Sequence, residues 1–535
     1  MKRRDKQRPK REELRVEELK AILDRAREVL GAQDLAKLTA AIDTLAFLTS
    51  ELEAKGASIA RLRRWLFGAS TEKTSRVTGE RKGATTAASG AAKDESGTKE
   101  KQKGHGRNGA ESYRGADKVK VPHAVLHTGD RCPVCEIGKV YVQAEPAVLV
   151  RVKGIAPLTA TVYEKERLRC NACLEVFTAV SPPGVGSQKY DETAASMIGV
   201  LKYGCGLPFN RLARLEGSLG IPLPAPTQWE VVHRAAGLLE PAYAELVRQA
   251  AQGEVVHNDD TTMRILELEA LSSEDDDEGG ERSGVFTTGI VSTAEGRQIA
   301  LFFTGRQHAG ENLAAVLQQR AADLTPPIQM CDALSRNTAG DFETILANCI
   351  AHARRRFVDV ADSFPDECRH VLETLRTVYG HDAVARQEKM TPEERLRLHQ
   401  AQSAPLMDGL EHWLCEQIEQ RKVEPNSGLG EAIGYMRSHW QALTLFLREP
   451  GAPLDNNICE RALKKAILHR KNALFYKTKN GARVGDLFMT LIHTAELHGA
   501  NPFDYLVELQ SHADQVAAAP DHWMPWNYQD ALTSR

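Results

Sequence analysis

The amino-acid sequence predicts a multidomain α/β protein made of a coiled-coil helix, a small zinc-binding β module, a helical module and a larger α/β domain. Its 535 residues exceed the roughly 100–200 residues of one domain. Two C-x-x-C pairs lie in a strand-rich stretch. Near residue 253 the pattern changes from helical spacing to short apolar runs. A hydrophobic content of 42% is enough for a sizeable core.

Residues 11–68 are predicted to form a long helix with a coiled-coil seam. Apolar side chains recur at steps of three and four, at Leu35, Leu38, Ile42, Leu45 and Leu52. Such a seam would pair two subunits, and the alternative is an amphipathic helix packed on its own chain. Residues 69–118 are rich in Gly, Ala, Ser, Thr, Lys and Glu, so we expect a disordered linker there.

Two pairs of cysteines predict a zinc-binding module at residues 119–180. Each pair has the C-x-x-C spacing that turns two thiolates toward one ion, and 34 residues separate the pairs. Four thiolates around one Zn²⁺ form a closed, structural site, whereas the alternative is four unligated thiols. The predicted ligands are Cys132, Cys135, Cys170 and Cys173.

Residues 188–250 are predicted to be a helical module that resembles a helix-turn-helix, and the alternative is plain helix packing. Residues 253–511 are predicted to be one α/β domain. Its strand-like runs are "EVVHNDDTTMRIL", "GVFTTGIVST", "QIALFFTG" and "PIQMCDA". We expect mainly helices at 338–450 and again at 456–511, followed by a C-terminal tail at 512–535.

Charge is nearly balanced over the whole chain, at −3, but it is uneven locally. Residues 455–483 hold eight Lys or Arg against two acids, and the first eleven residues hold seven Lys or Arg against one Asp. Such clusters suit a polyanion, although a solvated basic face is the default interpretation. No secretory signal and no membrane-spanning apolar run is recognisable, so we expect a cytoplasmic protein without membrane contact.

Three acidic residues lie where a metal site could be built. Asp259 ends the run "EVVHND" and Asp332 ends "PIQMCD", so each follows a strand-like segment. Glu460 begins a helix that is otherwise basic, with Arg461, Lys464, Arg470 and Lys471. For any single acid, a helix cap or turn is the simpler interpretation.

Several segments in a fixed order carry a resemblance to a known family. The longest are "PLDNNICERALKKAILHRKNALF" and "GARVGDLFMTLIHTAELHGANPFDYL". The others are "RRWLFGASTEK", the paired C-x-x-C, "HNDDTTMRIL", "MCDALSRN" and "CIAHARRRF". Together they resemble transposases of the insertion sequence 66 family, over most of residues 35–510.

The resemblance implies a DDE transposase with a ribonuclease H-like core and a helical insertion at about 365–450. It implies a catalytic triad of Asp259, Asp332 and Glu460 that holds two Mg²⁺ or Mn²⁺ ions for cleavage and strand transfer at insertion-sequence ends. Double-stranded DNA of the ends and target, further copies of the chain and accessory proteins of the same element are the expected partners. When bound to DNA, the protein would lie at the nucleoid. The residues expected to hold DNA phosphates are Arg461, Lys464, Arg470 and Lys471.

The chain departs from the family's pattern in ways that leave alternatives open. The first acid is followed by Asp260, where the family usually has Glu; strand register favours Asp259 as the ligand, with Asp260 as the alternative. The aromatic residue common after the second Asp is absent, and Ala473 replaces a common Trp. In "CIAHARRRF", His352 and the following arginines could contact DNA, support the metal site or form an exposed basic helix. A non-catalytic DNA-binding regulator and a nuclease without strand transfer are the alternative functions.

Overall fold

The computed structural model describes residues 37–39, 118–122, 124–143, 149, 156–169, 171, 176–186, 188–272 and 284–533. The chain divides into two compact units, Met1–Arg81 and Lys82–Arg535. In the first unit the described residues 37–39 are helical and exposed. The rest of the predicted coiled coil and nearly all of the predicted linker lie outside the described residues, so these predictions stay untested.

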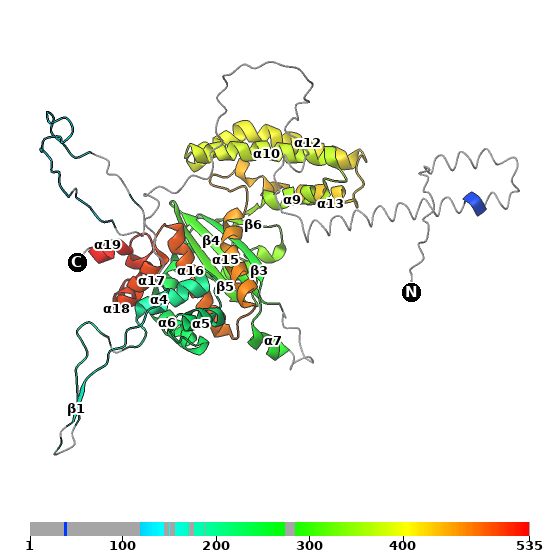
Figure 1. The fold of residues 1–535 in the computed structure, drawn as a ribbon. Coiled ribbons are helices and arrows are strands. Elements are labelled where there is room, and N and C mark those ends of the chain that lie inside the picture. The colour runs from blue at the N-terminus through cyan, green and yellow to red at the C-terminus, as the bar shows by residue number, and fades with distance from the viewer. Residues whose placement is uncertain are drawn as a thin grey trace, which may run out of the picture. The chain divides into compact units, whose positions relative to one another are not determined.

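A five-stranded mixed sheet forms the centre of the larger unit, in the order β5-β4-β3-β6-β7 (Figure 1). Strands β3, β4 and β5 are antiparallel neighbours, whereas β6 and β7 continue the sheet parallel to β3. The strands are β3 (Val255–Thr262), β4 (Phe286–Ala294), β5 (Arg297–Gly305), β6 (Ile328–Cys331) and β7 (Ile345–Asn348). The first four lie in the predicted strand-like runs, whereas β7 falls in a stretch expected to be mainly helical. The predicted mixed α/β class is confirmed.

Two helices pack on opposite faces of the central strands. Helix α15 (Asn457–Ala473) and helix α8 (Ala309–Leu317) both contact β3 and β4. Successive residues of a strand point to opposite faces, so the paired residues Asp259 and Gly289 face one way and Asp260 and its partner on β4 face the other. Cys459 of α15 donates a hydrogen bond to the Gly289 carbonyl. On the other face, His308 at the start of α8 is hydrogen-bonded to Asp260.

Helix α16 (Lys479–Leu497) covers the outer edge of β5 with polar side chains. Four N–H groups of β5, at alternate residues, donate to acceptors on α16 and its C-cap that are four residues apart. Four helical residues rise about 6 Å and two strand residues about 6.6 Å. The acceptors on α16 therefore stay level with the donors on β5 along the whole edge. This pairing leaves the sheet edge closed to another strand. The pairs are Gln298 with His498, Ala300 with Thr494, Phe302 with Thr490 and Thr304 with Asp486.

The helices before and after the sheet share one apolar core. Helix α6 packs against α16, α17 and α18, and residues in the predicted tail, including Trp523 and Tyr528, are buried in that core. Helices α5 and α6 flank the loop 219–224, and its helix-turn-helix function stays a prediction. The bounds are α4 (Glu192–Gly199), α5 (Phe209–Ser218), α6 (Ala225–Ala250), α17 (Pro502–Ser511), α18 (Ala513–Ala518) and α19 (Tyr528–Thr533).

Between β7 and α15 the chain is helical. Helices α10 and α12 lie side by side (Figure 1), and α13 packs on α9. Asp382 of α10 pairs with Arg395 at 2.7 Å, and Arg395 also donates to the Ala452 carbonyl just before α15. Burial would raise the pKa of Asp382, but hydrogen bonds from His399 and Arg395 outweigh it and hold the pKa at about 2. The helices are α9 (Ile350–Val360), α10 (Pro365–Gln387), α11 (Pro392–Leu398), α12 (Ala404–Glu419), α13 (Gly428–Ser438) and α14 (Trp440–Leu443).

Two short elements lie outside these layers. Strands β1 (Arg167–Arg169) and β2 (Val176–Thr178) form an antiparallel pair in the segment predicted to bind zinc. Helix α7 (Leu266–Ser272) follows β3. None of the helices in the described residues combines the length and the apolar character that crossing a membrane requires.

Candidate active site around strand β3

Asp259 lies in the second half of the central strand, which continues to Thr262 rather than ending at this residue as predicted, and it is half-buried. Its Oδ1 accepts a hydrogen bond of 2.8 Å from the backbone N–H of Asp260. Burial above all, together with the negative charges of Asp332, Asp260 and Glu460, raises the pKa of Asp259 to about 7 against that hydrogen bond. The carboxylate is therefore held where its own charge is unfavourable, among other acids. A bound cation would stabilise the ionised carboxylate at this position.

Asp332 follows β6 directly and lies beside Asp259 across the sheet. In the parallel pairing His257 is opposite Met330, so two further residues along each strand bring Asp259 opposite Asp332. Neighbouring strands are about 4.8 Å apart. Asp332 Oδ1 accepts hydrogen bonds from the amide of buried Asn337 and, at 3.3 Å, from the Leu334 backbone N–H. These bonds fix the turn that carries the second aspartate.

Glu460 reaches this region because the first turns of α15 press closely on β4. A Cβ atom at Gly289 would stand 2.9 Å from two side-chain carbons of Leu463, so only glycine permits the observed spacing. The Cys459 thiol, one residue before Glu460, lies 3.2 Å from the Gly289 carbonyl. Since Gly289 pairs with Asp259, the start of α15 lies over the first aspartate.

Asn456 joins the start of α15 to β3. Its side chain is fully buried, and its Nδ2 donates to the Asn258 carbonyl at 3.0 Å. Its Oδ1 lies 3.2 Å from Nδ1 of His257, which is then the donor. Burial, with a smaller contribution from the charge of Arg461, lowers the pKa of His257 to about 4 against the hydrogen bond to Asn456. A neutral imidazole therefore supports the helix that carries Glu460.

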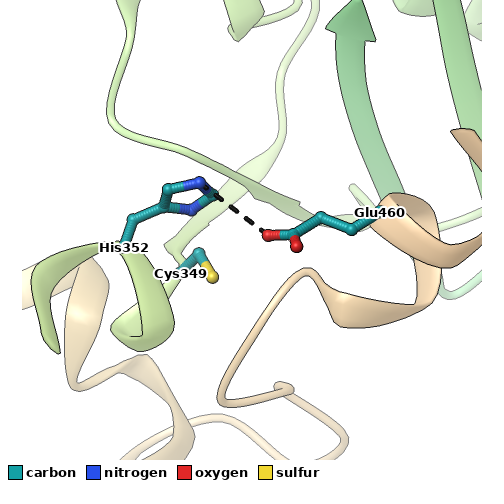
Figure 2. A group of neighbouring side chains, drawn as sticks. All are labelled: Cys349, His352 and Glu460. Atoms are coloured by element: carbon teal, nitrogen blue, oxygen red, sulfur yellow. Dashed lines mark ion pairs between the residues drawn. The ribbon is translucent and has the colours of Figure 1, made fainter. Parts of the chain in front are cut away.

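Glu460 also faces two side chains from the start of α9, and Figure 2 shows the three pointing toward one another. Ligand atoms of Cys349, His352 and Glu460 all lie within 4.8 Å of one another. His352 Nε2 is 3.8 Å from Glu460 Oε1, an ion-pair distance if the imidazole is protonated. Burial raises the pKa of Cys349 to about 12, so the thiol is protonated in this arrangement. We refer to these residues as the Cys349–His352–Glu460 cluster.

Asp260, the alternative first ligand, has a different set of neighbours. Its side chain is 3% exposed, and its two oxygens lie 3.1 Å from His308 Nδ1 and 3.5 Å from an Arg336 nitrogen. Both partners are on the α8 side of the sheet, away from α15. Paired in this way, Asp260 is tied to groups that hold it in place. Asp259 faces the side of α15, and its role as the ligand stays a prediction.

The four basic residues predicted to hold DNA differ in their surroundings. Arg461, Lys464 and Lys471 are exposed on α15. Arg470 instead turns back to the sheet, where its Nη1 donates to Thr261 Oγ1 at 3.0 Å and to the carbonyl and hydroxyl of Thr262. Arg470 therefore joins α15 to the end of β3, while the other three remain available to a polyanion.

The described half of the predicted zinc site has the local geometry of a metal-binding turn. The Cys132 N–H donates to the Gly138 carbonyl, and the Glu136 N–H donates to the Cys132 carbonyl at 2.9 Å. Backbone N–H groups of Gly138 and Ile137 and the Cys132 side chain bond Cys135 and lower its pKa. These bonds favour a thiolate, which is the form that binds zinc. Cys170 and Cys173 lie outside the described residues, so the four-ligand prediction stays untested.

Two functional candidates were not identified from the sequence. Cys349 is followed three residues later by His352, a C-x-x-H spacing at a helix start that places both side chains on one side. That spacing was a usable signal for the cluster. Asn456 had no such signal, because its partners His257 and Asn258 are almost 200 residues away in sequence.

Comparisons with known proteins identify the family of this chain. The model of the Transposase IS66 family matches residues 188–484, which hold β3, β6, α9 and α15. Three relatives are uncharacterized proteins of Sinorhizobium fredii (strain NBRC 101917 / NGR234). Protein y4jD is 26% identical over 72% of this chain and 74% of its own, y4hP 26% over 62% and 61%, and y4qI 28% over 64% and 63%. The matched segment is more than half of the chain and includes all three acids, and the protein belongs to the IS66 transposase family.

Proposed function

We propose that the protein is a DDE-type transposase that cleaves and joins DNA at the ends of an insertion sequence. Membership of a transposase family supports a role in transposition in general. The observations that support the finer proposal are that Asp259 is in register with Asp332 across β3 and β6, and that the charges of Asp332 and Glu460 both help to raise the pKa of Asp259. These residues come from three elements that are far apart in sequence.

The sheet supports a ribonuclease H-like core. The first acid is on the central strand, which is paired on one side with an antiparallel hairpin and on the other with parallel β6. The second acid follows β6, and the third comes from α15, after the helical stretch α10–α14. The helical stretch matches the insertion at about 365–450 that the family resemblance implied.

The acids are suited to hold divalent cations. Carboxylate oxygens are hard ligands that Mg²⁺ and Mn²⁺ prefer, and Glu460 Oε1 is buried without a hydrogen-bond partner among the described residues. Two such ions would stabilise the attacking and leaving oxygens of a phosphoryl transfer. Asp259, Asp332 and Glu460 would hold them, and Asn337, Asn456 and Gly289 would keep the three carboxylates in position.

The surface of α15 supports binding of the DNA backbone. Lys464 and Lys471 are four and eleven residues after Glu460, so they lie on its side of the helix. Arg461 lines a cleft of about 440 Å³ beside the start of α15, together with Arg386. Cations along such a surface hold phosphates and fix the register of the DNA without reading its sequence. In this proposal the DNA strand passes along α15 to the acids.

The remaining modules have roles in the same proposal. Cys132 and Cys135, with Cys170 and Cys173, would hold one structural Zn²⁺ that stabilises the fold around β1 and β2. The helices at 188–250 would contact the transposon ends. The helix predicted at 11–68 would pair two copies of the chain, as a transposase that acts on two DNA ends requires.

The proposal is tested with a cleavage assay on the full-length protein. A labelled duplex with the terminal sequence of the element that encodes the chain is incubated with Mg²⁺, and nicked and joined strands are separated on a denaturing gel. Wild type is expected to give both products. Glu460→Gln keeps the shape of the side chain but removes its charge, so it should bind the duplex and fail to cut it.

Asp323→Asn is the matched control, because Asp323 is an exposed acid in the turn before β6, away from the three carboxylates. It should cut like wild type. Cleavage by Glu460→Gln at the wild-type rate would remove Glu460 from the site. Tight end binding by wild type without cutting in either Mg²⁺ or Mn²⁺ would favour the alternative, a non-catalytic DNA-binding regulator.

A further inference from the structure

The Cys349–His352–Glu460 cluster brings three different metal-binding atoms together. Cys349 caps the start of α9, His352 lies in its first turn, and Glu460 lies in the first turn of α15 (Figure 2). A sulfur, an imidazole nitrogen and a carboxylate oxygen lie within 4.8 Å of one another. His352 and Glu460 side chains are each about a quarter exposed, at 26% and 29%, so the cluster lies near the surface, although Glu460 Oε1 itself is buried.

The spacing of the cluster suits an ion between the groups better than direct contact. His352 Nε2 and Glu460 Oε1 are 3.8 Å apart, which is too far for a hydrogen bond. Two ligands at 2.0–2.1 Å from a tetrahedral ion stand about 3.3 Å apart, so a small closure would seat one. Glu460 Oε1 and His352 Nδ1 are buried without hydrogen-bond partners in the described part of the chain. Leaving such atoms unpaired is unfavourable, and binding an ion through Oε1 would satisfy that oxygen.

A backbone hydrogen bond orients the sulfur of Cys349. The backbone N–H of Asn456 donates to Cys349 Sγ at 3.2 Å. This bond fixes the direction of the sulfur, and a metal that binds there would displace the thiol proton. The same Asn456 is tied to β3, so the cysteine and Glu460 are held to one support.

We propose that the Cys349–His352–Glu460 cluster binds a transition-metal cation of the Zn²⁺ type, and that this ion competes with the catalytic use of Glu460. The combination of sulfur, nitrogen and oxygen ligands selects Zn²⁺ or Co²⁺ and disfavours Mg²⁺, which binds oxygen. The competition with catalysis rests on the proposed function, in which Glu460 is a catalytic residue. A Glu460 held toward α9 is withdrawn from Asp259 and Asp332, so the bound ion inhibits cleavage.

The binding arm of the test does not depend on activity. Full-length protein already loaded with zinc at its cysteine module is dialysed against added Zn²⁺, and bound metal is measured for wild type, Cys349→Ser and His352→Gln. Wild type is expected to bind one equivalent more than either variant. Co²⁺ added to the same zinc-loaded protein should give a sulfur-to-metal charge-transfer absorption that Cys349→Ser lacks.

Cys415→Ser is the matched control, because Cys415 is a partly buried free cysteine on α12 outside the cluster. It should bind metal like wild type. Circular dichroism of each variant checks folding, and His352→Gln, at a partly exposed position, remains informative if Cys349→Ser unfolds. Equal metal content in wild type and both folded variants would overturn the proposal.

The inhibition arm uses cleavage of the end duplex in Mg²⁺ at increasing Zn²⁺. His352→Gln should need at least about tenfold more Zn²⁺ for half inhibition than wild type, since a lost ligand costs about 10- to 100-fold in affinity. The same Zn²⁺ sensitivity in both proteins would overturn the competition. A wild type that never cuts would refute the proposed function, whereas the extra metal equivalent would still decide whether the site exists.

Discussion

Asp259 and Asp260 are adjacent on β3, yet they face opposite sides of the sheet and have opposite surroundings. Asp260 is paired with His308 and Arg336 and is almost fully buried. Asp259 is surrounded by negative charge from Asp332 and Glu460, which adds to burial in raising its pKa to about 7. The side chains are chemically identical, so the difference comes from which helix covers each face.

In the proposed function, this difference separates a structural acid from a catalytic one. A buried carboxylate with cationic partners is compensated within the fold. One placed among other carboxylates is compensated only by something from outside, which is a frequent feature of sites that bind cations. The two faces of one strand therefore predict different consequences for the same substitution.

The largest expected effect is the loss of cleavage in Asp259→Asn. Removing the charge takes away one ligand of the proposed metal site while keeping the shape of the side chain. Cleavage should fall by about 10³-fold or more, whereas binding of the end duplex should change little because exposed cations of α15 provide it. The measurement is the rate of strand nicking under single-turnover conditions.

Asp260→Asn is expected to lose stability rather than cleavage activity. It leaves His308 and Arg336 without their acid, so we expect a loss of about 1–3 kcal/mol in the free energy of unfolding with cleavage largely kept. Urea denaturation gives the first quantity. Normal cutting by Asp259→Asn together with an inactive, stable Asp260→Asn would exchange the two roles.

The second effect concerns Gly289, which lets α15 approach the Asp259 face. In Gly289→Ala the new methyl group would meet Leu463 at 2.9 Å and push the first turns of α15 outward. A displacement of about 1 Å at a catalytic group can cost about 10²-fold, so cleavage should fall by about that factor. End binding is expected to stay close to wild type.

Gly305→Ala is the control for that variant, since a Cβ atom at Gly305 would meet nothing within 4 Å. Its cleavage rate should match wild type. If Gly289→Ala also cut at the wild-type rate, the close packing of α15 on β4 would have no part in positioning Glu460.

Sequence reasoning reached the class of the fold and the residues of the candidate site through local patterns. The β-branched runs predicted β3 to β6, and Asp332 follows β6 as expected, whereas β3 continues three residues beyond Asp259. The assignment of Asp259 over Asp260 depended on the alternation of side chains, which is a local property. The family resemblance, confirmed over residues 188–484, supplied the third acid.

Local sequence patterns could not predict contacts between segments that are distant in sequence. Strand β7 is four residues long, too short for its pattern to stand out from the helices around it. Arg470 looks like its basic neighbours in sequence, and only its bonds to Thr261 and Thr262 show that it belongs to the sheet. The ladder between α16 and β5 likewise depends on residues more than 180 positions apart.

Asp486 of α16 is a third buried acid to compare with Asp259 and Asp260. It has hydrogen bonds but no proposed metal. Burial raises its pKa to about 7, against hydrogen bonds from the backbone and side chain of Thr304. Because this pKa lies above the ordinary value of 3.8, the folded chain holds an extra proton between these pH values. The resulting stability is fully present below about pH 4 and is lost as the pH rises through about 7.

Asp486→Asn should remove that dependence. Between pH 5 and 8 the free energy of unfolding of wild type should fall by about 2–3 kcal/mol relative to the variant. Urea denaturation of both proteins at the two pH values gives the difference and cancels the titration of other groups. Parallel pH profiles for wild type and variant would show that Asp486 is ionised in the fold throughout this range.

The smallest expected effect separates the two sides of α15. Lys464 and Lys471 are exposed, so replacing each by Ala should remove one phosphate contact and lower the slope of log affinity against log salt by about one. Affinity should fall alike for end and unrelated duplexes, because phosphates carry no sequence. Fluorescence anisotropy over a series of salt concentrations measures both quantities.

Arg470→Ala is the informative contrast, because its charge is the same and its bonds are different. Losing its contacts with Thr261 and Thr262 should lower the free energy of unfolding by about 1 kcal/mol and leave the salt slope nearly unchanged. If Arg470→Ala lowered the slope as much as Lys471→Ala, the guanidinium would leave the sheet to hold DNA. In that case the β3 side of α15 would also belong to the DNA-binding surface, and the division between structural and functional charges would shift by one residue along the helix.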